Sequence, residues 1–180
     1  MPRLKRARRA DSLGTMAEDQ ITIRDAAGAD LDWLAQLWFA GWQDAHADIL
    51  PAALARVRTL ASFRERLANA LPSVRVAVRA GAPAGFALLK GNELDQFYVT
   101  ADARGTGVAP ALMADALARL RDSGATTAWL ACAIGNRRAA RFYEKLGWHR
   151  AGVMTSQLST SAGVFELDVW RYEIGLMASD

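Results

Sequence analysis

The middle of the chain alternates apolar with other residues at the two-residue period of β-strands. Three valines alternate at 74–79, a turn leads to a second apolar run at 84–90, and a second turn leads to ELDQFYVT at 93–100. In this third stretch the alternation shifts by one position between Leu94 and Phe97, which is typical of a β-bulge. The pattern therefore predicts three consecutive strands, the third of them bulged.

Apolar residues spaced three and four apart predict two helical regions before these strands. The first has Asp30 as its N-cap and carries an apolar face that includes Trp38. The second follows Pro51, and its later part opens with Ser62 and Glu65 at the spacing of a capping box.

The rest of the chain alternates helices and strands. The remaining elements are predicted as strands at 21–24, 126–133, about 148–155 and about 164–173, and as helices from 107 to about 123 and from Asn136, as N-cap, to Gly147. The order is β-α-α-β-β-β-α-β-α-β-β. It predicts an α/β (α+β-like) fold with a central mixed, mostly antiparallel sheet of about seven strands and about four flanking helices.

Charge changes this picture only at the N-terminus. The formal net charge is +3, but five of the 22 basic residues precede Ala10 and no acid does, so the remainder carries 17 basic and 19 acidic residues. We expect residues 1–19 to be a disordered basic leader and 20–176 to be one domain. Alternatives for the leader are sequence upstream of a start at Met16, a transit peptide, or a segment that binds nucleic acid.

The sequence contains neither a secretory signal nor a run long enough to span a bilayer, so we expect a cytoplasmic protein that does not bind membranes. Cys132 is the sole cysteine, which excludes an intrachain disulfide. His46 and His149 are the only histidines and lie far apart, so we expect no metal site. Cys132 falls in a buried strand and is interpreted as a small hydrophobic residue.

Candidate chemistry begins at RGTGVA, residues 104–109, between a strand and a helix. The N-terminus of a helix has free N–H groups and a positive dipole end. Gly105 and Gly107 allow those groups to converge on an anion, and Arg104 adds a charge. Pro110 is tolerated in a first turn but has no N–H to donate. This phosphate cradle, as we call residues 104–109, lacks the motifs of a P-loop or a dinucleotide fold. Taken alone, its glycines could equally be turn residues.

A second motif, NRRAARFYEKLGW at 136–148, follows the cradle. With Arg104-x-x-Gly107-x-Ala109 it resembles the GNAT superfamily of acyl-CoA-dependent N-acyltransferases. That family carries Arg/Gln-x-x-Gly-x-Gly/Ala and then Asn-x-x-Ala-x-x-Phe-Tyr-x-x-x-Gly. Both motifs match in order and at the usual separation, and the element order matches over about 20–175.

The resemblance implies a V-shaped opening between the strands at 93–100 and 126–133, in which acetyl-CoA lies as co-substrate. The residues implied to contact it are Phe97, Tyr98, Val99, Arg104, Gly105, Thr106, Gly107, Val108, Ala109, Pro110, Asn136 and Phe142. It also implies that Tyr143 is the general acid for the leaving thiolate; the alternative is that Tyr143 is half of an apolar pair with Phe142.

A base for the amine is less well defined by the motifs. Some family members carry a glutamate five residues before the motif asparagine, and here that position is Ala131. Glu93, at the start of its strand, is the better candidate, acting through water. Asp95 lies two residues further on, on the same strand face if no bulge intervenes. Two alternatives remain. Glu93 and Asp95 could be a solvated strand end, or the amine could attack without a protein base.

The acceptor amine is expected near the first helix, where Trp38, Trp42 and His46 recur at four-residue spacing. Core packing is preferred for Trp38, whereas Trp42 and His46 lie towards the helix end, where exposure rises. Aromatic rings with Asp44 and Asp48 nearby would suit a cationic amine, but a solvated face is the preferred interpretation for these two acids.

Three functions follow from the resemblance. The first is an N-acetyltransferase acting on a primary amine of a small molecule or peptide. The second is acetylation of a protein N-terminus or lysine, and the third is a non-catalytic acyl-CoA sensor. Relatives that dimerise through late strands also suggest a homodimer.

Overall fold

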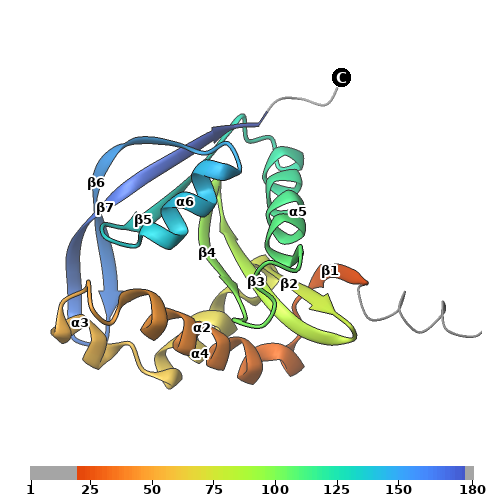
Figure 1. The fold of residues 1–180 in the computed structure, drawn as a ribbon. Helices are drawn as coiled ribbons and strands as arrows, with labels where there is room; N and C mark the ends of the chain where they lie inside the picture. Colours follow the sequence, from red (N-terminus) through yellow and green to blue (C-terminus); the bar gives the residue numbers. More distant parts are fainter. Residues whose placement is uncertain (1–19, 177–180) are drawn as a thin grey trace, which may run out of the picture.

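The computed structural model describes residues 20–176, and one seven-stranded sheet organises them (Figure 1). The strands are β1 (Ile21–Asp25), β2 (Val74–Arg79), β3 (Ala82–Lys90), β4 (Glu93–Val99), β5 (Thr127–Ala133), β6 (His149–Thr160) and β7 (Gly163–Gly175). Their spatial order is β1-β2-β3-β4-β5-β7-β6. All neighbours are antiparallel except β4 and β5, which are parallel. The predicted fold class is confirmed.

Five α-helices accompany the sheet in the described residues. They are α2 (Leu31–His46), α3 (Ala52–Val57), α4 (Leu60–Ala70), α5 (Val108–Asp122) and α6 (Arg137–Lys145), with 3-10 turns η1 (Gly28–Asp30) and η2 (Leu71–Ser73). The helical region after Pro51 is therefore two helices, so residues 20–176 contain one helix more than the roughly four predicted.

The helix starts differ in detail from their predicted caps. Asp30 is the N-cap of α2, but its carboxylate accepts from the Arg24 guanidinium and the Ala27 N–H, so it caps the preceding turn. Helix α4 begins earlier than Ser62, because Thr59 has extended backbone angles and its Oγ1 accepts from the Ser62 N–H. The capping box predicted for Ser62 was therefore wrong, and Thr59 takes that role.

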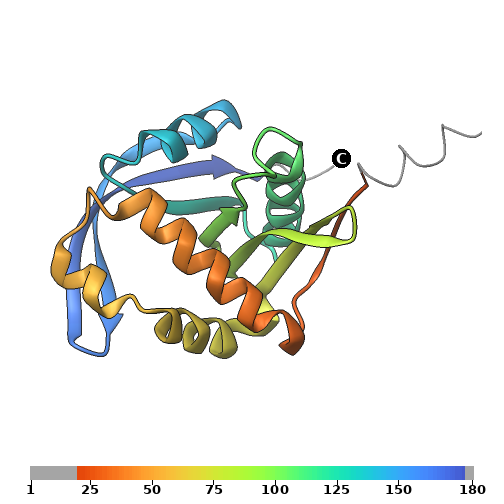
Figure 2. The same ribbon diagram turned by 60° about the horizontal axis from the view of Figure 1, so that its bottom comes forward.

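Helices cover both faces of the sheet, and each face has its own apolar core. Helices α2, α3 and α4 pack on one face around Trp38, Phe63 and Phe86, as Figure 2 shows from below. Helices α5 and α6 pack on the other face around Leu112 and Leu130. None of the helices within 20–176 is long and apolar enough to cross a membrane.

The last two strands are longer than predicted and form a hairpin that curves towards α3 (Figure 1). Along the last part of β6 burial alternates, with Met154, Ser156 and Leu158 partly buried between exposed residues. Polar residues on this inner side weaken the alternating pattern of a strand. The strand predicted from the sequence therefore ended too early, at 155.

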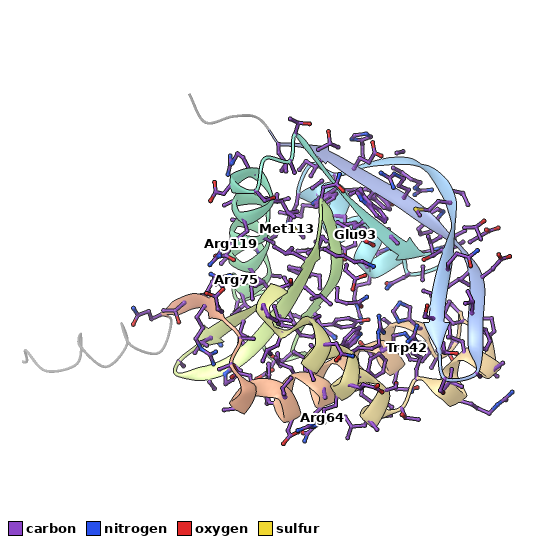
Figure 3. The ribbon with its side chains drawn as sticks, turned by 180° about the vertical axis from the view of Figure 1, so that it is seen from behind. Trp42, Arg64, Arg75, Glu93, Met113 and Arg119 are labelled. Atoms are coloured by element: carbon purple, nitrogen blue, oxygen red, sulfur yellow. The ribbon has the colours of Figure 1, made fainter. Side chains whose placement is uncertain are left out.

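An ion-pair network joins β1 and β2 to α5. Arg75 is buried and bonds both oxygens of Asp115 at 2.8 Å, and it also pairs with Asp25. Arg119 of α5 reaches the same Asp25 carboxylate at 3.3 Å (Figure 3). The network fixes α5, whose N-terminus carries the cradle, against the sheet.

Replacing Arg75 tests how much this network stabilises the fold. Arg75→Leu leaves Asp115 without its cation and Asp25 with Arg119 alone. We expect a loss of about 2–4 kcal/mol in the free energy of unfolding, less than for a fully buried pair because the two acids are partly exposed. Urea unfolding measures it. The control Arg64→Leu removes an exposed pair with Asp32 and should cost less than about 0.5 kcal/mol. Equal losses in the two variants would contradict the prediction.

Candidate active site

The parallel strands β4 and β5 touch at one end and then part. Glu93 pairs with Trp129, and the backbone N–H of Trp129 donates to the backbone carbonyl of Asn92 at 3.1 Å. No other β4–β5 pair occurs between residues 20 and 176. Between the parted strands lies a cleft of about 1220 Å³, bounded also by α2, α6, the cradle and the β6–β7 hairpin. This is the V-shaped opening that the resemblance implies.

Most predicted site residues line this cleft. They are Trp42, His46, Glu93, Asp95, Phe97, Tyr98, Val99, Arg104, Gly105, Gly107, Ala109, Pro110, Asn136, Phe142 and Tyr143. Three do not line it. Trp38 is fully buried against Phe63 and Phe86, Val108 is buried in the other core, and Thr106 Oγ1 donates to the Ala103 carbonyl at 2.6 Å.

The bulge predicted in β4 is present at Asp95. Leu88 pairs with Gln96 and Leu89 pairs with Leu94, which leaves Asp95 as the extra residue. A bulge changes the direction of side chains locally. Both Glu93 and Asp95 line the cleft, although the pairing of β3 with β4 shifts by one residue at Asp95.

The cradle carries free donors. Gly105 and Gly107 have φ of 78° and 91°, in the left-handed region that favours glycine. The N–H groups of Gly105, Gly107, Val108 and Ala109 make no hydrogen bond to any residue in 20–176. Pro110, third in α5, has no N–H, as predicted. Four free donors at a helix N-terminus, with open space beside Gly105, fit a pyrophosphate.

Arg104 already has an anionic partner. Asp44 of α2 accepts from Arg104 at 3.0 Å and from Arg138 of α6 at 2.6 Å. These guanidiniums lower the pKa of the Asp44 carboxyl, with the Arg138 hydrogen bond as the larger cause. Asp44 is therefore an ion-pair partner of the cradle and α6 and not a carboxylate free to bind a cationic amine. Asp48 is an exposed residue outside the cleft lining.

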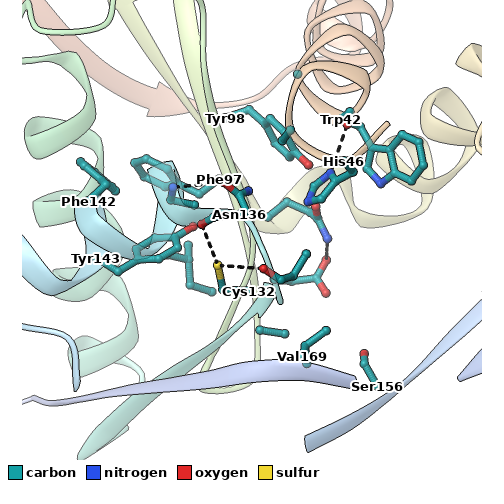
Figure 4. A pocket seen from close by; sticks show the side chains of 18 of the residues that line it. Trp42, His46, Phe97, Tyr98, Cys132, Asn136, Phe142, Tyr143, Ser156 and Val169 are labelled. Atoms are coloured by element: carbon teal, nitrogen blue, oxygen red, sulfur yellow. Dashed lines mark hydrogen bonds between the residues drawn. The ribbon is translucent and has the colours of Figure 1, made fainter. Parts of the chain in front are cut away.

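The second motif supplies the wall opposite α2. The rings of Phe97 and Phe142 stack with centroids 5.6 Å apart, and Asn136 Oδ1 accepts from the Ala139 N–H at 3.1 Å to cap α6 (Figure 4). The Tyr143 ring packs against Trp148 and Tyr172. Burial raises the pKa of the Tyr143 hydroxyl, so it is protonated at neutral pH and available as a donor.

Glu93 has the electrostatics of a weak base rather than a permanently charged acid. Burial, and after it the charge of the nearby Asp95, raise the pKa of Glu93 to about 7, although Lys90 and Arg171 oppose the shift. A carboxylate that titrates near neutral pH suits proton transfer from an amine.

The aromatic end of α2 is more buried than predicted. Trp42 is 6% exposed, and its ring lies 5.4 Å from the His46 ring. His46 Nδ1 lies 3.2 Å from the Trp42 carbonyl, which can only accept, so Nδ1 is the donor (Figure 4). Burial lowers the pKa of His46 to about 4, so the imidazole is neutral.

Cys132 lines the cleft beside Tyr143. Burial raises the pKa of its thiol to about 11, which leaves no reactive thiolate at neutral pH.

Sequence reasoning missed three arginines in the cleft lining: Arg138, which pairs with Asp44, and Arg58 and Arg66. Arg66 had a signal, since it lies with Phe63, Leu67 and Ala70 on the apolar stripe of α4, where a charge is out of place. Arg58 follows α3 and had none.

Comparisons with known proteins agree with this geometry. The acetyltransferase (GNAT) family model matches residues 31–148. An uncharacterised N-acetyltransferase of Mycobacterium bovis is 37% identical over 103 residues, which are 54% of this chain and 66% of that relative's length. The chain belongs to the GNAT acetyltransferase family.

Solved structures show the same fold. A GCN5-related N-acetyltransferase from Rhodopseudomonas palustris has a TM-score of 0.68 and 24% identity, covering 86% of this chain and 95% of that one. The PaiA N-acetyltransferase from Thermoplasma acidophilum, solved with coenzyme A, has a TM-score of 0.68 and 18% identity, covering 87% and 99%.

Blocking the cradle should abolish binding of coenzyme A. Gly107→Glu adds a negative charge at the cradle and strains the left-handed backbone that presents its N–H groups. We therefore expect calorimetry to show affinity for coenzyme A reduced at least tenfold, about 1.4 kcal/mol. Gly81→Glu is the matched control, because Gly81 has φ of 78° and lies outside the cleft lining. Unchanged affinity in folded Gly107→Glu would remove the cradle from the site.

Proposed function

We propose that this protein transfers the acetyl group of acetyl-CoA to a primary amine of a small molecule or peptide, by direct attack in a ternary complex. The observation that carries the proposal is a single cleft lined by the cradle, Tyr143 and Glu93. Membership of the acetyltransferase family supports the acetyl donor. The N–H groups of Gly105, Gly107, Val108 and Ala109 would hold the pyrophosphate. Arg104 would add charge.

The remaining donor contacts follow β4 and α6. The backbone of Phe97, Tyr98 and Val99 would bond the pantetheine and the acyl carbonyl, because β4 has no β5 partner beyond Glu93 in the described residues. Asn136 would touch the pantetheine arm. Phe142 would pack beside it, next to the Phe97 ring.

Acetyl-CoA supplies a thioester that a neutral amine can attack. Ionised Glu93 would take, through water, the proton that the ammonium must lose. Tyr143 would give its proton to the sulfur as the C–S bond breaks and the C–N bond forms, and the second proton of the nitrogen would restore the hydroxyl. Holding amine and thioester in one complex contributes through proximity.

Steady release of coenzyme A with a panel of primary amines tests the function. We expect turnover in the wild type and a kcat about 100-fold lower in Tyr143→Phe, with the KM for acetyl-CoA unchanged. Tyr172→Phe is the matched control, because its hydroxyl bonds Glu144 outside the cleft lining. Binding of acetyl-CoA without turnover on any amine or peptide would favour the sensor, and turnover on protein N-termini alone would favour the second alternative.

The role of Glu93 predicts a pH profile. The base is the ionised form, so with a pKa of about 7 kcat/KM should rise between pH 6 and 8 and then level off. Glu93→Gln should lose this inflection together with about 100-fold in kcat. The same inflection in Glu93→Gln would assign it to the amine, and Asp95→Asn then tests the alternate base.

A cytoplasmic location and a homodimer remain predictions. The homodimer would use the outer side of the β6–β7 hairpin, where Val153 and Val164 are exposed. The basic leader, with its alternative of binding nucleic acid, lies outside the described residues.

A further inference from the structure

The part of the cleft next to α3 and α4 contains a buried arginine that nothing in the described chain neutralises directly. Arg58 lines the cleft and is 5% exposed, but its guanidinium makes no hydrogen bond or ion pair with any residue in 20–176. Buried polar groups in proteins are almost always hydrogen-bonded. The nitrogens of Arg58 are not among the fully buried polar atoms that lack a partner in 20–176, so the guanidinium keeps access to the cleft, where an anionic ligand could bond it.

A second guanidinium lies close by. Arg66 of α4 lines the same cleft, and its Cζ lies 4.4 Å from the centroid of the Trp38 ring. The charges of Arg58 and Arg66 are near enough for each to affect the other, and Arg66 has no carboxylate bonded to it among residues 20–176 either. Burial and this neighbour lower the pKa of Arg58 to about 10, so both groups carry their charge at neutral pH.

The acids nearby do not balance these charges. Asp95 acts on both arginines through space, but no ion pair within 4.0 Å joins it to either of them. Glu93, with its pKa raised to about 7, carries only part of a charge at neutral pH, and His46 is neutral. The acceptor side of the cleft therefore has an excess of positive charge, unlike the pocket for a cationic amine that Asp44 and Asp48 would have suited.

We propose that the acceptor is an amine that also carries an oxyanion group, bound by Arg58 and Arg66 while its amino group faces Glu93. The inference rests on the proposed acetyl transfer and names its substrate class. A guanidinium offers paired N–H donors that match a carboxylate or a phosphate. The excess of positive charge disfavours a simple cationic amine and favours an amino acid or an amino-phosphate ester, whose anion offsets it.

Matched acceptors test the class. Each amino acid is compared with its amide and with the amine left by decarboxylation, and O-phosphoethanolamine is compared with ethanolamine, by release of coenzyme A. We expect kcat/KM at least tenfold higher for the anionic member of the preferred pair; whether that pair is a carboxylate or a phosphate pair identifies the source of the oxyanion. Equal or higher values for the members that lack the oxyanion would overturn the proposal and leave acetyl transfer intact.

Variants locate the oxyanion. Arg58→Gln should reduce the preference for the oxyanion-bearing acceptor to near one, chiefly by raising the KM for that acceptor. Arg66→Gln should reduce it partly. Arg64→Gln is the matched control, since Arg64 is exposed on α4 and bonded to Asp32. If thermal melting shows that Arg58→Gln is unfolded, two other variants decide the outcome. They are Arg66→Gln and Arg58→Lys, which keeps the charge but loses the paired donors. An unchanged preference in the folded variants would overturn the proposal.

A binding measurement separates this proposal from the function on which it rests. Calorimetry of N-acetyl amino acids and of their amides is carried out on the protein loaded with coenzyme A. Tighter binding of the acids, lost in Arg58→Gln but kept in Arg64→Gln, would support the oxyanion site even if no amine is acetylated. Equal binding of acids and amides would count against it even if acetyl transfer is observed.

Discussion

The separation of two parallel strands is the constraint on which the rest of the site depends. Strand β5 pairs along its whole length with β7, and β4 pairs with β3, but the two strands meet each other only at Glu93 and Trp129. Each therefore keeps one edge largely unpaired inside the protein, where backbone groups require partners. Two cores and the Arg75 network hold the flanking elements around this opening, so the cleft is built into the sheet.

The parts of the site that sequence could predict are those written in a local pattern. The cradle has its glycines at a strand-to-helix turn, and the bulge at Asp95 disturbs a period of two. The polar inner side of the β6–β7 hairpin did not look like a strand, because Ser156 lines a cleft and not a core. The Thr59 cap was missed because Ser62 offered an equally good local pattern.

Contacts between distant elements were beyond prediction from one sequence. The pairing of Asp44 with Arg104 and Arg138 spans separations of 60 and 94 residues. The isolation of Arg58 is a property of everything that surrounds it, so no residue type or spacing near it could have revealed it. Arg66 is intermediate, since its place on an apolar stripe is visible in the sequence but its partner ring is not.

The bridge made by Asp44 has a consequence for which anions the cradle accepts. Because its carboxylate already occupies Arg104 and Arg138, an incoming anion that needs either arginine must compete with an internal counter-ion. A monovalent ion such as acetate brings these arginines no more negative charge than Asp44 does. Unlike Asp44, it is not tethered to the protein. A pyrophosphate brings more charge and can use the free N–H groups of the cradle at the same time. Selection by valence is thus a consequence of one exposed aspartate on the opposite wall.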